Sequence, residues 1–109
     1  MPEETGALVV LSTVPDAEKG REIARALVEA RLAACATLSS PCESYYWWEG
    51  KISQDKEWML FIKTRTDLFS RLEEKLKSLH PYSVPEIIAL PVTYGSAKYL
   101  DWIKEETHP

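Results

Sequence analysis

The chain has 109 residues, of which 45% are hydrophobic and 28% are charged, and its net charge is −4. This length fits one domain, and a chain of this size buries roughly two-thirds of its unfolded surface, which is enough for a core. The acidic balance and the lack of a Lys/Arg cluster argue against nucleic-acid binding, and no apolar run approaches the ~20 residues of a membrane span. We therefore expect neither nucleic acid nor a membrane as a partner.

The first third of the chain predicts a strand followed by a helix. Residues 7–11 form a short apolar run rich in branched side chains, which predicts a buried strand. Hydrophobic residues then recur at helical spacing, which predicts an amphipathic helix over about 16–31. Thr13 or Asp16 is its expected N-cap.

A long β-hairpin is predicted next. Residues 32–38 and 44–48 favour one strand, in which Pro41 indicates a bulge or a sheet edge. Residues 49–50 predict the turn and residues 57–66 a third strand. Counted from the turn, the arms of this hairpin have about 14 residues, whereas typical strands have about 5–6. Arms of this length overhang a small core, and their aromatic tip is a surface that a small monomer should not expose. The hairpin therefore indicates an oligomer in which a neighbouring subunit covers the tip.

The last third predicts a helix, a strand and a final helix. Leucine spacing predicts the helix over about 67–79, and an apolar run predicts the strand over 87–93. Pro91 within that run indicates an edge strand or a bulge. Ser96 is the expected N-cap of the final helix.

The order of these elements predicts the fold class. A strand–helix–strand unit followed by a second one is the split βαβ arrangement. We therefore predict an α+β protein with a ferredoxin-like sandwich (βαββαβ plus a C-terminal helix). Residues 1–109 are expected to form a single domain, with an ordered core of about 7–104.

The connector before the fourth strand, residues 80–86, has the sequence His-Pro-Tyr-Ser-Val-Pro-Glu. Its two prolines make the backbone stiff and extended. The imidazole of His80 and the carboxylate of Glu86 converge on a cation only if the chain turns between them or neighbouring subunits bring them together, because six extended residues span about 20 Å. In the other interpretation, His80 caps the preceding helix and Glu86 accepts a hydrogen bond or an ion pair.

The two cysteines, Cys35 and Cys42, are predicted to be free thiols. On one strand they would lie roughly 23 Å apart, whereas a disulfide needs Cα atoms within about 7 Å. Free thiols are typical of a reducing compartment, so we expect a cytoplasmic protein. No paired nucleophile and base is recognisable, and we do not expect an enzyme.

Six motifs between about residues 7 and 104 resemble the CutA divalent-cation tolerance proteins. They are Thr13-x-Pro15-Asp16, Leu32-Ala33-Ala34-Cys35, Tyr46-x-Trp48-x-Gly50-Lys51, Ile62-Lys63-Thr64, His80-Pro81-Tyr82-x-Val84-Pro85-Glu86-Ile87 and Gly95-x-x-x-Tyr99-Leu100-x-Trp102. Each motif alone is weak, whereas all six in this order are specific. The resemblance implies a ferredoxin-like subunit in a homotrimer, with sheets joined edge to edge through the hairpins. It also implies a role in tolerance of divalent metals, copper above all, without an established enzymatic reaction.

The copper ligands proposed for members of this family are only partly present in this chain. Copper-associated members carry a Cys just before the Thr-x-Pro-Asp motif and a His pair before Pro-Tyr, whereas this chain has Ser12 and Leu79-His80. A hydroxyl is a poor ligand for a soft ion, and leucine is none. A site for copper or another divalent cation is therefore predicted to use His80, together with Glu86.

A second hypothesis follows from the architectural likeness of this family to PII-type signalling trimers. In it, the chain is a signalling or scaffold trimer that binds a small anionic effector or a protein partner at clefts between subunits. Trp48, Lys63 and Tyr82 are the predicted contacts. Without a ligand, Lys63 is expected to pair across the strands with Glu43 or Glu57.

Overall fold

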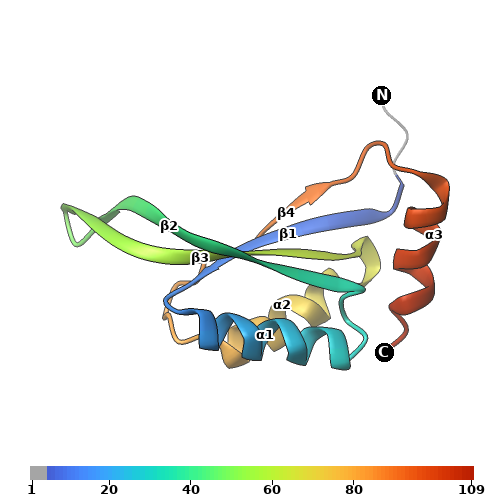
Figure 1. The fold of residues 1–109 in the computed structure, drawn as a ribbon, viewed down its shortest axis with the longest axis horizontal. Helices are drawn as coiled ribbons and strands as arrows, with labels where there is room; N and C mark the ends of the chain where they lie inside the picture. Colours follow the sequence, from blue (N-terminus) through green and yellow to red (C-terminus); the bar gives the residue numbers. More distant parts are fainter. Residues whose placement is uncertain (1–4) are drawn as a thin grey trace.

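The computed structural model describes residues 5–109, which form an α+β fold with one four-stranded antiparallel sheet and three α-helices. The elements are β1 (Ala7–Val14), α1 (Ala17–Glu29), β2 (Cys35–Trp48), β3 (Lys51–Arg65), α2 (Phe69–Leu79), β4 (Ile88–Pro91) and α3 (Ala97–Glu106). The strand order in the sheet is β2-β3-β1-β4. In Figure 1, α1 and α2 lie along one side of the sheet, and α3 stands at the end opposite the hairpin tip. No helix among the described residues combines the length and hydrophobicity of a membrane span.

Two predicted helix caps are confirmed. The Asp16 carboxylate accepts a hydrogen bond from the Lys19 amide at 2.7 Å and begins α1, and the Ser96 hydroxyl accepts one from the Tyr99 amide at 3.3 Å and begins α3. Such caps satisfy amides that lack a partner in the first helical turn. Thr13 is not a cap, because it belongs to β1.

The ends of β3 and β4 differ from the predicted ones, because pairing with the neighbouring strand sets where each strand begins and ends. The third strand begins at Lys51 and not at residue 57, because Lys51 pairs with Trp48 across the hairpin turn. The polar segment before residue 57 has no apolar alternation, and its partner strand imposes the extended conformation. The fourth strand is shorter than the predicted 87–93, since its ladder with β1 covers Ile88–Pro91, followed by one backbone hydrogen bond from Val92 to Ala7.

The main core lies between α1, α2 and one face of the sheet. Its fully buried side chains are Val10 and Val14 of β1, Leu60 and Ile62 of β3, Ile23 and Leu27 of α1, and Leu72 and Leu76 of α2. Burial of each such side chain contributes about 1.5–3 kcal/mol. This layer fixes β1 and β3, the two central strands.

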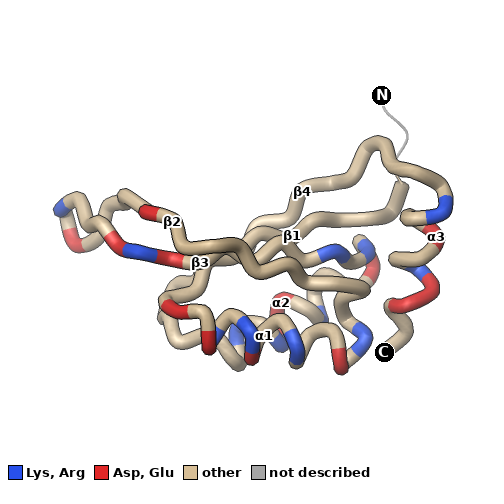
Figure 2. Tube along the Cα trace, in the orientation of Figure 1, with Lys and Arg blue, Asp and Glu red and all other residues tan. Residues whose placement is uncertain are grey.

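The opposite face of the sheet is covered by α3 at one end only. There Ile103 packs against Ala7 and Ala34, whereas Ile88 and Leu90 of β4 are 51% and 50% exposed. Figure 2 shows that neither β1 nor β4 carries a charged residue. The chain therefore presents an uncharged, largely apolar edge at β1 and β4, whereas β3 places Lys63 and Arg65 on the same sheet face.

The hairpin of β2 and β3 extends beyond the helices, as predicted (Figure 1). The two strands have 14 and 15 residues. Glu49 and Gly50 both have positive φ, at 50° and 75°, which is the conformation of a type I′ turn and matches the twist of the strands.

Pro41 lies at a β-bulge on an edge strand, so both structural interpretations of this proline are confirmed. The register shifts between Leu38 and Pro41, where β2 contains one more residue than β3. Because side chains alternate along a strand, one extra residue exchanges the faces to which the following side chains point. Beyond the bulge, Tyr46 and Trp48 share a face with Glu57.

Ser12 supplies a test of the core. Its side chain is fully buried, and its hydroxyl has no hydrogen-bond partner within residues 5–109. Replacement by alanine should raise the free energy of unfolding by about 1 kcal/mol, because a buried hydroxyl without a partner is destabilising. Urea unfolding followed by circular dichroism measures the change.

Thr64→Val is the matched control for Ser12→Ala. Thr64 is equally buried, but its hydroxyl donates to the Leu32 carbonyl at 2.6 Å. Its loss should lower the free energy of unfolding by about 1 kcal/mol. If both substitutions destabilise the protein equally, the Ser12 hydroxyl has a partner and this account of the core is wrong.

Candidate functional site

A surface cavity of about 590 Å³ lies between the hairpin and the connector that joins α2 to β4. It is lined by Thr13, Ser44, Tyr45, Tyr46, Trp47, Trp48, Glu57, Tyr82, Ser83, Val84 and Glu86. Its volume falls within the range of small-molecule sites. Two segments far apart in the sequence, 44–48 and 82–86, therefore build most of one concave surface.

The ring of His80 attaches the connector to β1. His80 is buried, and its Nε2 lies 2.7 Å from the Thr13 carbonyl oxygen, while its Nδ1 accepts a hydrogen bond from the Tyr82 amide at 3.1 Å. Since Nδ1 accepts, the ring proton is on Nε2 and is donated to Thr13. The backbone amide of His80, and not its ring, bonds to the end of α2, at the Leu76 carbonyl. The predicted helix cap is thus made by the backbone.

Tyr82 joins the connector to the hairpin. Its hydroxyl donates to Oε2 of Glu57 at 2.8 Å, and Glu57 is only 6% exposed. Burial, and then this hydrogen bond to a carboxylate, raise the pKa of Tyr82 far above its usual range. The hydroxyl is therefore a permanent donor that holds the Glu57 carboxylate in place.

A second phenol–carboxylate pair lies on the same face of the hairpin. Tyr46 donates to the carboxylate of Asp55, and this hydrogen bond is the main cause that raises the pKa of Tyr46. Both tyrosines consequently present fixed rings, and both of their acceptors carry negative charge. The site is rigid, aromatic and acidic.

Three of the predicted site residues meet at this cavity. Trp48, Tyr82 and Glu86 line it, whereas the buried His80 at the start of the connector does not. Lys63 is elsewhere on the sheet, where its Nζ donates to the Thr37 hydroxyl at 3.1 Å. The structure therefore does not bring His80 and Glu86, or Lys63 and Trp48, into one site within a subunit.

The predicted ion pairs of Lys63 with Glu43 or Glu57 are wrong. Lys63 is opposite Cys35 in the strand register, several residues from either acid. Glu43 instead accepts hydrogen bonds from Tyr45 at 2.9 Å and from Gln54 at 3.2 Å. The register, which the bulge shifts, decides these partners.

Glu57, Thr13 and Tyr46 are residues of this site that sequence reasoning did not assign to it; the ring of Tyr46 was expected only as part of the aromatic hairpin tip. Glu57 lies on the same face of the third strand as Met59 and Phe61. An acidic residue in line with apolar ones was the sequence feature that could have marked it as a site residue. For Thr13, the main-chain carbonyl is the functional group, and no sequence signal marks it.

The described residues of the chain do not fit a preformed metal site. Within residues 5–109, no three His, Cys, Asp or Glu side chains are grouped so as to hold a metal ion. Both ring nitrogens of His80 are used in hydrogen bonds, and Glu86 is exposed on a cavity that His80 does not line. A ligating histidine needs one nitrogen free for the metal.

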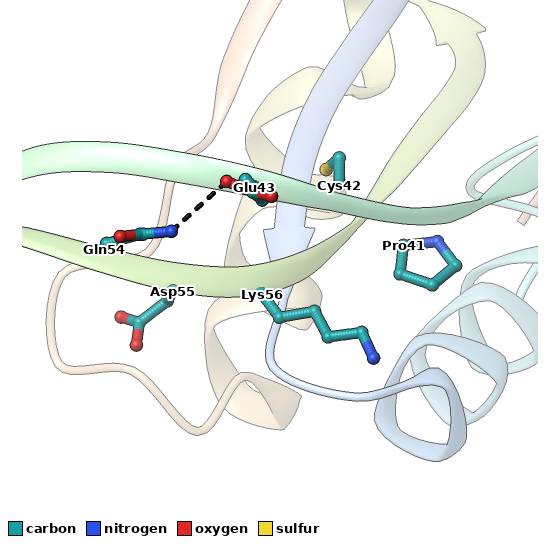
Figure 3. A pocket seen from close by; sticks show the side chains of 6 residues that line it. All are labelled: Pro41, Cys42, Glu43, Gln54, Asp55 and Lys56. Carbon is teal, nitrogen blue, oxygen red and sulfur yellow. Dashed lines mark hydrogen bonds between the residues drawn. The ribbon is translucent and has the colours of Figure 1, made fainter.

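A second cavity, of about 480 Å³, lies along the hairpin and is shown in Figure 3. Its lining residues are Pro41, Cys42, Glu43, Gln54, Asp55 and Lys56. Glu43 accepts a hydrogen bond from Gln54, and the Lys56 side chain extends away from the two acids, with its ammonium over the Trp58 ring (Figure 3). Its lining carries charges of both signs and no aromatic ring. This cavity therefore offers a ligand fewer specific contacts than the first one.

His80→Ala should lower the free energy of unfolding by about 2–4 kcal/mol. The substitution removes a buried ring and leaves the Thr13 carbonyl and the Tyr82 amide without their partner. The matched control is His108→Ala, since His108 is exposed near the C-terminus, where a change should stay within about 0.5 kcal/mol. Equal stability of the two variants in urea unfolding would refute the anchoring role of His80.

Comparison with protein families gives a match over residues 8–106, to the family described as CutA1 divalent ion tolerance protein. The Divalent-cation tolerance protein CutA of Thermus thermophilus is 52% identical over 91% of this chain and 96% of its own length. The Protein CutA 1, chloroplastic, of Oryza sativa is 46% identical over 93% of this chain, which spans 57% of that relative.

Solved structures give the same result. The divalent cation tolerance protein (Cut A1) from Thermus thermophilus superposes with a TM-score of 0.92 and 50% identity, covering 94% of this chain and 99% of that one. The Periplasmic divalent cation tolerance protein CutA from Archaeoglobus fulgidus gives a TM-score of 0.90 and 36% identity, with coverage of 94% and 99%.

Proposed function

The chain belongs to the CutA1 divalent ion tolerance family, and on this premise we propose that it acts as a homotrimeric protein of divalent-cation tolerance or response. The observation that carries the trimer is the apolar surface that one subunit leaves uncovered. Helices protect one face of the sheet, whereas the hairpin and the strand β4 project unprotected hydrophobic side chains. Subunit association is the usual means of burying such a surface.

Two parts of this surface suit contacts between subunits. On the hairpin, Trp47 and Ile52 are paired and are 74% and 66% exposed, and at the other edge of the sheet Ile88 and Leu90 of β4 are also exposed. β2 and β4 are both edge strands, which offer unpaired backbone groups to another chain. We therefore propose a ferredoxin-like subunit whose sheet joins those of its neighbours edge to edge. The strand order β2-β3-β1-β4, with two helices on one face, supports this arrangement.

Sedimentation equilibrium at micromolar concentration should give three times the subunit mass of 12.4 kDa. Trp47→Glu should shift the mass towards the monomer, because it puts a charge on the proposed contact. Val28→Glu makes the same kind of change on an exposed residue of α1 and should leave the mass unchanged. A monomeric wild type, or equal dissociation by both variants, would contradict the trimer.

His80 and Glu86 are the proposed ligands of a divalent cation, copper in particular. Within a subunit the imidazole is held by two hydrogen bonds, so a cation gains His80 only by displacing one of them. We propose that the remaining ligands come from a neighbouring subunit. Direct binding should accordingly be weak, and tighter for copper than for zinc, as is general for nitrogen and oxygen ligands.

Calorimetric titration of copper and zinc into the wild type and into Glu86→Gln and His80→Ala tests this site. Binding should weaken in both variants. Glu86 is exposed, so its substitution should not impair folding. All three proteins also carry His108→Ala, so that copper bound by this other histidine does not contribute to the titration. Equal binding by the wild type and both variants would remove the proposed ligands and favour an indirect role in tolerance.

We further propose a cytoplasmic protein without catalytic activity. Cys35 and Cys42 are free thiols, which is typical of a reducing compartment, although relatives are named chloroplastic or Periplasmic. The Cys35 sulfur lies 3.7 Å from the Tyr99 hydroxyl, and the Cys42 thiol donates to the Glu57 carbonyl at 3.2 Å. Neither thiol is thus paired with an imidazole that would activate it as a nucleophile.

The second candidate function, a trimer that binds a small effector as PII-type proteins do, is favoured by one observation. The cavity between the hairpin and the connector has the volume of a ligand site and is lined by two of the predicted contacts, Trp48 and Tyr82. Lys63, the contact that would attract an anion, does not line it.

A further inference from the structure

We propose that the cavity between the hairpin and the connector 80–86 binds a small organic cation, an ammonium group attached to an aliphatic body. This site goes beyond the proposed role in divalent-cation tolerance, and it replaces the anionic effector expected from Lys63. The charge, the hydrogen bonding and the aromatic walls of the cavity each support it.

The charged residues that line the cavity are all acidic. They are Glu57 and Glu86, and the lining contains no Lys, Arg or His. An anionic ligand would approach two carboxylates without a compensating cation. A positively charged ligand, in contrast, is complementary to the cavity, and electrostatic complementarity governs the choice of partner.

Glu57 has one carboxylate oxygen left for a ligand. The residue is 6% exposed and Tyr82 donates to its Oε2, whereas among residues 5–109 no hydrogen bond or ion pair reaches its Oε1, which is not fully buried. A buried carboxylate is stabilised by a cation and by hydrogen bonds to its remaining lone pairs. An ammonium N–H at Oε1 would form a charge-assisted hydrogen bond. A quaternary ammonium would gain the Coulomb attraction to Glu57 without this hydrogen bond.

Aromatic side chains distinguish an organic cation from a metal ion. Tyr46, Trp48 and Tyr82 line the cavity, and the first and third are fixed by their hydrogen bonds to Asp55 and Glu57. The faces of such rings attract ammonium groups and also pack against aliphatic carbon. A hydrated divalent cation needs oxygen ligands instead, and the described residues offer no cluster of three acidic, His or Cys ligands. The walls therefore fit a ligand with both charge and apolar surface.

Calorimetric titration of the assembled full-length protein, treated with a chelator and dialysed, tests the proposal with choline as the probe. Its neutral isostere 3,3-dimethylbutan-1-ol has the same shape without the charge. Choline should bind at least about tenfold more tightly, since the attraction of its charge to the aromatic rings adds to the Coulomb attraction of Glu57. Equal binding of the two compounds, or no binding of choline, would overturn the proposal. A cavity filled by a neighbouring subunit would give the second of these results.

Matched variants then locate the site. Glu57→Gln keeps an acceptor for Tyr82 but removes the charge, and it should weaken choline binding about tenfold. Glu105→Gln removes the same charge from an exposed position on α3, outside the cavity, and should have no effect. Thermal unfolding verifies that both variants are folded. Equal effects of the two substitutions would show that the overall charge, and not this cavity, binds the probe.

Failure of this proposal is distinguishable from failure of the proposed function. Sedimentation and the metal titrations do not depend on choline, and they test the trimer and the divalent-cation ligands separately. Trp48→Leu adds an independent readout, because it removes an aromatic ring and leaves every charge in place. It should weaken choline binding and leave the binding of the neutral isostere nearly unchanged.

Discussion

The site depends on two hydrogen bonds made by one buried ring. Through Nε2, His80 donates to the Thr13 carbonyl and ties the connector to the central strand β1; through Nδ1, it accepts from the Tyr82 amide and fixes the connector itself. This attachment brings the Tyr82 hydroxyl to Glu57 on the hairpin. The histidine of the connector motif thus supports the cavity wall, at a position that does not line the cavity.

The hairpin gives the subunit more strand than its helices protect. β2 and β3 run for 14 and 15 residues, while α1 and α2 cover only the part of the sheet near the core. The side chains of the projecting part have no helix to pack against, and the two faces of the hairpin differ in chemistry. One face carries Tyr46 and Trp48 beside Glu57, and the apolar tip remains for association. The part of the hairpin that extends beyond the helices therefore underlies both the proposed trimer and the proposed ligand site.

Local chemistry allowed much of the fold to be predicted from the sequence. Asp16 and Ser96 begin helices because of their side-chain oxygens, and Pro41 marks a bulge because it lacks an amide hydrogen. The partners of Lys63 and Glu57 were not predictable in this way. They depend on a strand register that one extra residue shifts, and on the path of the connector through space. Those constraints are non-local, and the wrong ion pairs of Lys63 follow directly from the missing register.

The central claim is that the His80 ring is held in a single tautomer by the fold. A long-range ¹H–¹⁵N correlation spectrum of the metal-free protein tests it most directly, because the chain has only 2 histidines and His108→Ala removes the other signal. The account predicts a protonated Nε2 that exchanges slowly and an Nδ1 without a proton. A proton on Nδ1, or a mixture of tautomers, would contradict it, because the hydrogen bond from the Tyr82 amide then cannot exist.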